Sequence, residues 1–183
     1  MQLLIDMKKK RTSKAYFPAL TGIFGALALA LSFIERLILS AFPLPMGIKP
    51  GFSNIIVMFV CSALGPLPAI GIAVIKAAFA ALLSGVSAGI ISLTGGVLSV
   101  LTMSLMLKIS KKSLSYTGIS VISAVMHNLG QTLAASLLTG SSLFLGYMPV
   151  LLLTGAVFGT VTGITLNITM PYLMKLNIFD HKK

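Results

Sequence analysis

Four side chains that can bind a polar ligand stand inside stretches that are otherwise apolar. His127, Asn128 and Gln131 occur within five residues of one such stretch, and Lys76 lies in the middle of another. The two amides can donate and accept hydrogen bonds, the imidazole can do either, and the ammonium adds positive charge. Together these residue types suit a phosphate, a carboxylate or a quinone-like head group.

The positions of these residues along their apolar stretches place them deep in a membrane. Lys76 lies about nine residues after Leu67, near mid-depth at a helical rise of about 1.5 Å per residue, and His127 lies at a similar depth. A charge near the centre of a bilayer costs about 3 kcal/mol, so it usually faces a partner, a cavity or water. His127 and Gln131 share one helix face, and Asn128 flanks it. We expect this face to look into a helix bundle.

Two structural roles compete with ligand binding for these residues. Polar side chains in membrane helices also serve as hydrogen bonds between helices, and Lys76 could form an ion pair with Glu35. Glu35 is the only acidic residue that we place within the membrane, against Arg36, Lys76 and Lys49. The interior therefore has surplus positive charge, and an anionic or strongly hydrogen-bonding ligand is the simplest compensation.

The composition indicates whether the chain folds in water or in a membrane. Of its 183 residues 56% are hydrophobic and 9% are charged, and the mean hydropathy is +1.01. These values are typical of integral membrane proteins. The chain is strongly basic, but its basic residues gather at the ends of apolar runs and form no stripe with aromatics, so we expect no nucleic-acid partner.

We predict an all-α bundle of six membrane-spanning helices, because a spanning helix needs about 20 apolar residues. The spans are Phe17 to Leu39, Ser53 to Leu64, Leu67 to Ser84, Ala88 to Leu107, Thr117 to Leu138 and Leu145 to Leu173. The second is short, and is tilted, re-entrant or extended back to Pro50. Placing both termini in the cytoplasm puts every basic residue except Arg36, Lys49 and Lys76 on the inner side, as the positive-inside rule requires. Residues 1–16 and 175–183 are then basic cytoplasmic segments around a membrane domain of residues 17–174.

Small residues indicate how these helices pack. In the last span Gly155, Gly159 and Gly163 recur every four residues, a spacing that lets helix backbones approach closely. Gly95 and Gly96 stand in a similar stripe, "SLTGGVLS". Close packing explains most of this pattern, and we also expect the Gly95-Gly96 pair to open room for a ligand.

The first span has two unlike sides. Ala19, Gly22, Ala26 and Ala30 fall on one side, and Glu35 points to the other. If the small side meets a neighbouring helix, Glu35 faces the interior of the bundle.

The chain lacks the residues that several kinds of chemistry require. The chain has no G-x-x-x-x-G-K-[ST] phosphate loop, its two aspartates, Asp6 and Asp180, stand at opposite ends, and no Cys/His cluster suits a metal. We therefore expect no enzymatic activity, no cofactor and no metal site. Glu35 with His127 leaves only a minimal proton relay.

Three stretches resemble a known membrane family: "MGIKPGFSNIIV" (Met46 to Val57), "SLTGGVLSVLTM" (Ser92 to Met103) and "HNLGQ" (His127 to Gln131). They are similar to the bacterial Gx transporters, which are often labelled heptaprenyl diphosphate synthase component I. These are grouped with the substrate-binding S components of energy-coupling factor (ECF) transporters. The resemblance implies six helices, a bacterial cell membrane location, and partnership with a membrane coupling subunit and ATPases.

The resemblance also implies roles for particular residues. A small-residue stripe on the first helix, here Gly22, Ala26 and Ala30, would dock the coupling subunit. The substrate would lie in the outer half of the bundle under the loop from Phe42 to Phe52, with Lys49 and Asn54 at the base of this loop. His127, Asn128 and Gln131 would line the floor of the pocket, and Lys76 would add charge.

Two other classes of function remain open. The chain could be a non-catalytic membrane subunit that recruits a soluble isoprenoid or quinone enzyme through its lysine-rich ends, or it could be a stand-alone channel or carrier. The absence of aspartate-rich motifs argues against synthase chemistry in the chain itself. The ligand that we expect is small, and anionic or related to isoprenoids or quinones.

Overall fold

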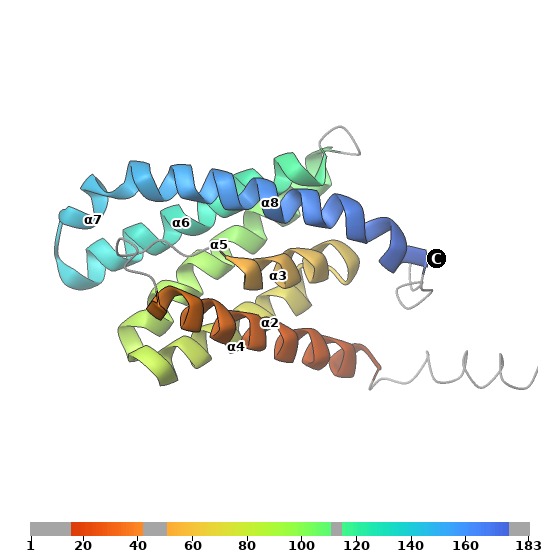
Figure 1. Ribbon diagram of the computed structural model, residues 1–183, viewed down its shortest axis with the longest axis horizontal. Coiled ribbons are helices and arrows are strands. Elements are labelled where there is room, and N and C mark those ends of the chain that lie inside the picture. The colour runs from red at the N-terminus through yellow and green to blue at the C-terminus, as the bar shows by residue number, and fades with distance from the viewer. Residues whose placement is uncertain (1–15, 42–50, 111–114, 176–183) are drawn as a thin grey trace, which may run out of the picture.

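A computed structural model describes residues 16–41, 51–110 and 115–175, and within these ranges all of the regular secondary structure is helical. The helices are α2 (Tyr16–Ala41), α3 (Phe52–Ala63), α4 (Pro66–Ser84), α5 (Val86–Ser110), α6 (Tyr116–Thr139), α7 (Leu143–Gly146) and α8 (Met148–Lys175). Figure 1 shows them as one bundle, in which the first residues of α2 and the last residues of α8 lie at the same end.

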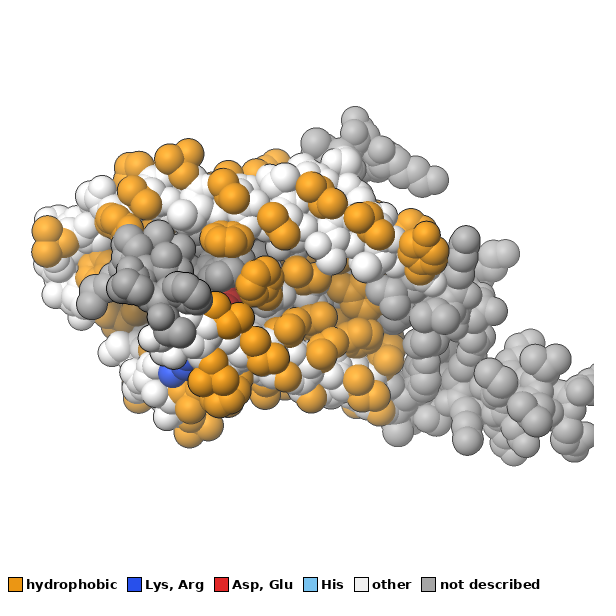
Figure 2. Space-filling view, viewed as in Figure 1, with side chains coloured by type: hydrophobic (Ala, Val, Ile, Leu, Met, Phe, Trp, Pro, Cys, Tyr) orange, Lys and Arg blue, Asp and Glu red, His pale blue; other side chains and the backbone are white. Residues whose placement is uncertain are grey.

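Five of these helices are long and apolar enough to cross a membrane: α2, α4, α5, α6 and α8. Their outward faces carry large apolar side chains such as Ile23, Leu82, Leu137 and Leu153. Hydrophobic side chains spread over the molecular surface in Figure 2, where charged groups are few. Such a surface is stable against lipid and not against water. The predicted all-α membrane bundle is confirmed, and the chain is a multi-pass membrane protein.

The second predicted span, α3, is shorter than a bilayer. Its 12 residues cover about 18 Å at 1.5 Å per residue, against about 30 Å for the hydrocarbon core. It starts at Phe52, after Gly51 in a left-handed conformation with φ 73°. Pro50, to which the prediction allowed the span to extend, lies outside the described residues. The helix ends before Gly65, whose φ of 101° favours glycine, and Pro66 then opens α4.

The start of the last span differs from its prediction. We expected it at Leu145, but the chain forms the single turn α7 there and begins α8 at Met148. Pro149 explains the later start, because a proline lacks the N–H that an interior helical position needs and fits the first turn instead.

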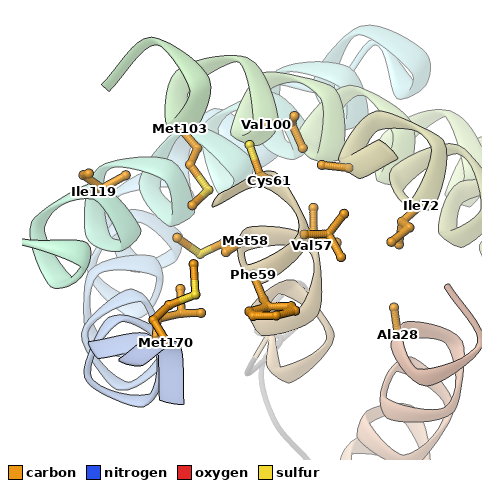
Figure 3. Packing of buried hydrophobic residues seen from close by; sticks show 13 residues of the cluster. Ala28, Val57, Met58, Phe59, Cys61, Ile72, Val100, Met103, Ile119 and Met170 are labelled. Atoms are coloured by element: carbon orange, nitrogen blue, oxygen red, sulfur yellow. The ribbon is translucent and has the colours of Figure 1, made fainter. Parts of the chain in front are cut away.

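The short helix α3 occupies the centre of the bundle, packed against α2, α4, α5 and α8. Figure 3 shows Val57, Met58, Phe59 and Cys61 of α3 among buried side chains from the surrounding helices. This apolar cluster fills the half of the bundle that α3 reaches. Among the described residues, no helix continues the line of α3 beyond its first residue.

Glycines allow the outer helices to pack closely. A Cβ atom on Gly159 of α8 would lie 2.8 Å from the Cα of Val121, and one on Gly163 would lie 2.4 Å from the Cα of Thr117. Both distances are too short, so α6 and α8 approach this closely only because these positions are glycine. The predicted packing role of this stripe is confirmed.

Helix α2 lies at the edge of the bundle, against α3 and α4. Its two sides differ as the sequence predicts: Glu35 is buried, while Gly22, Ala26 and Ala30 are exposed. A Cβ atom on Gly22 would meet nothing within 4 Å among the described residues. The small-residue side of α2 is therefore exposed in the part of the chain that the structure describes.

Candidate functional site

A cavity of about 390 Å³ lies beside the first turn of α3. It forms there because α3 starts partway through the bundle, while α2, α4 and α6 run past it. Its volume falls within the range of small-molecule pockets. The lining residues come from five helices and Gly51: Ser32, Glu35, Arg36, Ser40, Gly51, Ser53, Asn54, Lys76, Phe79, Ala80, Leu83, Ser92, His127, Asn128 and Gln131.

The cavity brings together five of the eight residues for which the sequence predicts ligand binding. Asn54, Lys76, His127, Asn128 and Gln131 all line it, although they belong to three different helices. The helical period places His127 and Gln131 on one face of α6, and this face borders the cavity. Ligand binding by these residues stays a prediction.

Lys76 and Asn54 hold two walls of the cavity together. The Lys76 Nζ atom donates a hydrogen bond of 2.7 Å to Asn54 Oδ1. Asn54 lies in the first turn of α3, so this bond ties the start of the short helix to α4. An ammonium group carries three N–H bonds, so it can hold Asn54 and also contact an anion.

Glu35 and Arg36, which are neighbours on α2, fasten two further segments to the same cavity. The Glu35 carboxylate accepts a hydrogen bond from the backbone N–H of Gly51, the residue that precedes α3. The Arg36 guanidinium donates to the hydroxyl of Ser84, the last residue of α4. A carboxylate at the start of a helix also interacts favourably with the helix dipole. Both side chains line the cavity while they fix its walls.

Asn128 differs from its neighbours on α6 because it also holds α8. Its Nδ2 atom donates a hydrogen bond of 2.6 Å to the backbone oxygen of Leu151. His127 and Asn128 also line a second hollow of about 20 Å³, which borders Ser99 and Thr162. This volume and these polar groups suit one buried water molecule.

The other predicted ligand-binding residues have different positions. A Cβ atom on Gly95 would lie 2.5 Å from Gln131 Cγ, and one on Gly96 would lie 3.1 Å from the Cβ of Ala73. The two glycines thus let α5 approach α6 and α4, and neither is among the described residues that line the cavity. The room that we expected them to open is occupied by these helix contacts. Lys49 lies outside the described residues, as does most of the predicted lid from Phe42 to Phe52.

Several lining residues were missed by the sequence interpretation, although a signal existed for them. Ser32, Arg36 and Ser40 recur every four residues and so form one polar face of α2. Ala80 and Leu83 stand at matching helical steps after Lys76. Extending the faces of Glu35 and Lys76 by one turn in each direction would have found Ser32, Phe79 and Ala80.

The cavity offers charge and hydrogen bonds, and its described lining has more cationic than acidic groups. Arg36 and Lys76 stand against Glu35, and His127 can add a further donor. Among the described residues no group of three or more His, Cys, Asp or Glu side chains could hold a metal ion. This lining is chemically suited to holding a small polar molecule with an anionic group.

Comparison with known families gives one match. The family model described as heptaprenyl diphosphate synthase component I matches residues 24–169, a range that includes every lining residue of the cavity. Neither the curated proteins nor the solved structures give a match. Because the matched range covers most of the 183 residues, the chain belongs to the heptaprenyl diphosphate synthase component I family.

Proposed function

We propose that this protein is a membrane-embedded substrate-binding subunit, which captures a small anionic or quinone- or isoprenoid-related ligand from the outer side of the membrane. The observation that carries this proposal is the 390 Å³ cavity, because it gathers Lys76, His127, Asn128 and Gln131 from helices far apart in sequence. A polar cavity within an apolar bundle is costly, since each polar group must be desolvated. A bound ligand offsets this cost.

The position of the cavity supports capture from outside. The cavity lies at the end of the bundle where α2 and α4 finish and where α3 and α5 begin. Lys108, near the finish of α5, is exposed at the opposite end. By the positive-inside rule the end with the lysines faces the cytoplasm, so the cavity belongs to the outer half.

Transport requires a source of energy that this chain lacks. Its sequence holds no phosphate loop for ATP hydrolysis, so we propose that a coupling subunit and ATPases of the ECF type supply it. The exposed small side of α2, with Gly22, Ala26 and Ala30, is the surface that we propose for the coupling subunit. Small residues permit close approach of a second membrane helix.

A second candidate function is favoured by the name of the family. A component I of heptaprenyl diphosphate synthase would be a membrane subunit that works with a separate synthase component. In that case this chain is non-catalytic and acts by recruiting the soluble partner to the membrane. The cavity would then hold a product or lipid, or would stay without a ligand.

Co-purification separates the two candidates. The tagged protein is purified in mild detergent from its own cells, and mass spectrometry identifies both proteins and small molecules. ATPases and a membrane coupling subunit support the transporter, whereas a prenyl synthase alone supports the second candidate.

The ligand is tested in the same preparation with Lys76→Met, and with Lys108→Gln as a control that removes an exposed lysine far from the cavity. We expect a small molecule that co-purifies with wild type and control and is lost from Lys76→Met. Identical small molecules in all three samples would contradict binding in this cavity.

A further inference from the structure

Most side chains that line the cavity end in a polar or charged group, although apolar atoms also form much of its wall surface. Of the 15 lining residues, only Phe79, Ala80 and Leu83 carry apolar side chains. A prenyl chain is stabilised by apolar walls, at about 0.8 kcal/mol for each buried CH₂ group. A prenyl chain alone would leave the hydrogen bonds of the serines, amides and charged groups unmade. A compact polar molecule fits these walls better than a long prenyl chain.

Opposite charges line the cavity from different helices. Lys76 and His127 come from α4 and α6, while Glu35 comes from α2. Helix α2 packs against α3 and α4, whereas α6 packs against α5 and α8, so the cavity lies between Glu35 and the wall of α6. A molecule that fills the cavity therefore meets the Glu35 carboxylate from α2 and the imidazole of His127 from α6, while Lys76 reaches it from α4.

Glu35 has acceptor capacity beyond its contact within the protein. It is 6% exposed, and its Oε1 atom accepts from the Gly51 N–H. A carboxylate has two oxygens and about four acceptor sites. Within residues 16–41, 51–110 and 115–175 the Gly51 N–H is the one donor found for this carboxylate, so the described groups compensate only part of its lost hydration. A cationic donor on a ligand supplies what is missing.

We propose that the ligand is a compact zwitterion: its anionic group lies toward Lys76 and His127, and its ammonium group or other cationic donor lies toward Glu35. This inference rests on the proposed function, and it narrows the ligand class by excluding a long prenyl chain from the cavity. Arg36, which is held by Ser84, borders the same space.

This chemistry can come from two sources. A water-soluble zwitterion of the amino-acid type carries both groups, and so does the headgroup of phosphatidylethanolamine. The soluble probes phosphoethanolamine and gamma-aminobutyrate represent the shared chemistry, and the composition of the surrounding bilayer separates the sources.

Binding is measured with the full chain in phosphatidylcholine nanodiscs, by calorimetry and by the shift in melting temperature. Each zwitterion has a matched partner that lacks its ammonium, namely ethyl phosphate and butyrate, and butylamine lacks the anion. Geranyl diphosphate serves as the prenyl probe. We expect at least one zwitterion to bind at least tenfold more tightly than the matched probe that lacks its ammonium group. The same zwitterion should also bind at least tenfold more tightly than butylamine and geranyl diphosphate.

The variant Glu35→Gln isolates the role of the acidic wall. A glutamine keeps an oxygen that can accept from Gly51, so the start of α3 stays fastened while the negative charge is lost. We expect this variant to bind the zwitterion no more tightly than the matched anionic probe. Its affinity for the anionic probe should stay within twofold of the wild-type affinity. The control Lys108→Gln should leave every affinity unchanged.

The outcomes distinguish a failure of the zwitterion proposal from a failure of the binding cavity. If geranyl diphosphate or the anionic partners bind as tightly as the zwitterions, and Lys76→Met abolishes that binding, the zwitterion is wrong while the binding cavity stands. If no probe binds wild type, both claims fail. If discs that contain phosphatidylethanolamine weaken phosphoethanolamine binding, the lipid headgroup is the source; unchanged binding points to a soluble ligand.

Discussion

Lys76 on α4 donates a 2.7 Å hydrogen bond to Asn54 on α3, and this bond joins two walls of the cavity. Asn54 lies near the start of α3 and Lys76 in the middle of α4. The two residues meet because α3 and α4 pack side by side. Their contact does two things, since it fixes the first turn of the short helix and orients the ammonium group in the cavity.

The first prediction concerns this bond. Asn54→Ala should lower the affinity for an anionic probe such as ethyl phosphate severalfold, because Lys76 loses the acceptor that orients it. Lys76→Met should weaken that binding at least as much, to an affinity that calorimetry can still measure. The double variant should be no worse than Lys76→Met, because the two residues act together, with a coupling of about 0.5–3 kcal/mol. Calorimetry on the four proteins of the cycle measures this, and additive losses would show that Asn54 acts independently.

The sequence predicts the polar face of α6 because a helical period alone brings His127 and Gln131 together. It also predicts that Glu35 lies away from the small side of α2, for the same reason. Partnerships between helices could not be predicted in this way. The contact of Lys76 with Asn54 depends on how α3 and α4 pack, and no period within one helix specifies that.

Glycine roles show a second limit of the sequence. Gly95 and Gly159 look alike as members of small-residue stripes, and both were open to a packing role. For Gly95 we also expected space for a ligand, but its neighbours Gln131 and His127 approach from α6 and occupy that space. A missing side chain leaves either a gap or a close helix contact, and only the arrangement of the neighbouring helix decides between them.

The second prediction concerns the packing of α6 and α8. Gly159→Ala should lower the melting temperature in detergent, because its Cβ would lie 2.8 Å from the Cα of Val121 and force the helices apart. Overpacking of this kind typically costs about 1–3 kcal/mol. The matched control is Gly71→Ala in α4, where a Cβ meets nothing within 4 Å among the described residues. There alanine should be neutral or stabilise by up to about 1 kcal/mol.

The third prediction concerns the exposed small side of α2. Ala26→Leu and Ala30→Leu together should weaken co-purification with a membrane coupling subunit, because the larger side chains block the close approach of a helix. Both side chains are exposed and neither lines the cavity, so melting temperature and ethyl phosphate binding should stay as in wild type. Unchanged co-purification would remove the support for docking at this surface.

The fourth prediction concerns orientation in the membrane. In a variant without Cys61, a cysteine at Lys108 should react only with reagents that reach the cytoplasm. A cysteine at Ser142, which is exposed between α6 and α8, should react with impermeant reagents added outside the cell. The reverse pattern would place the cavity on the cytoplasmic side and contradict capture from outside.

The last prediction separates two neighbours on α6 that both line the cavity. Asn128→Leu removes the 2.6 Å bond to the Leu151 oxygen and should lower the melting temperature, since such bonds in membranes contribute about 0.6–1.7 kcal/mol. His127→Leu removes a polar group from the cavity wall and should abolish ethyl phosphate binding with a smaller fall in melting temperature. Melting curves give the melting temperature of each variant, and calorimetry gives its affinity for ethyl phosphate. If His127→Leu proves the more destabilising and still binds the probe, then His127 serves helix packing, and the anion must be held by the groups on α4 and α2 instead.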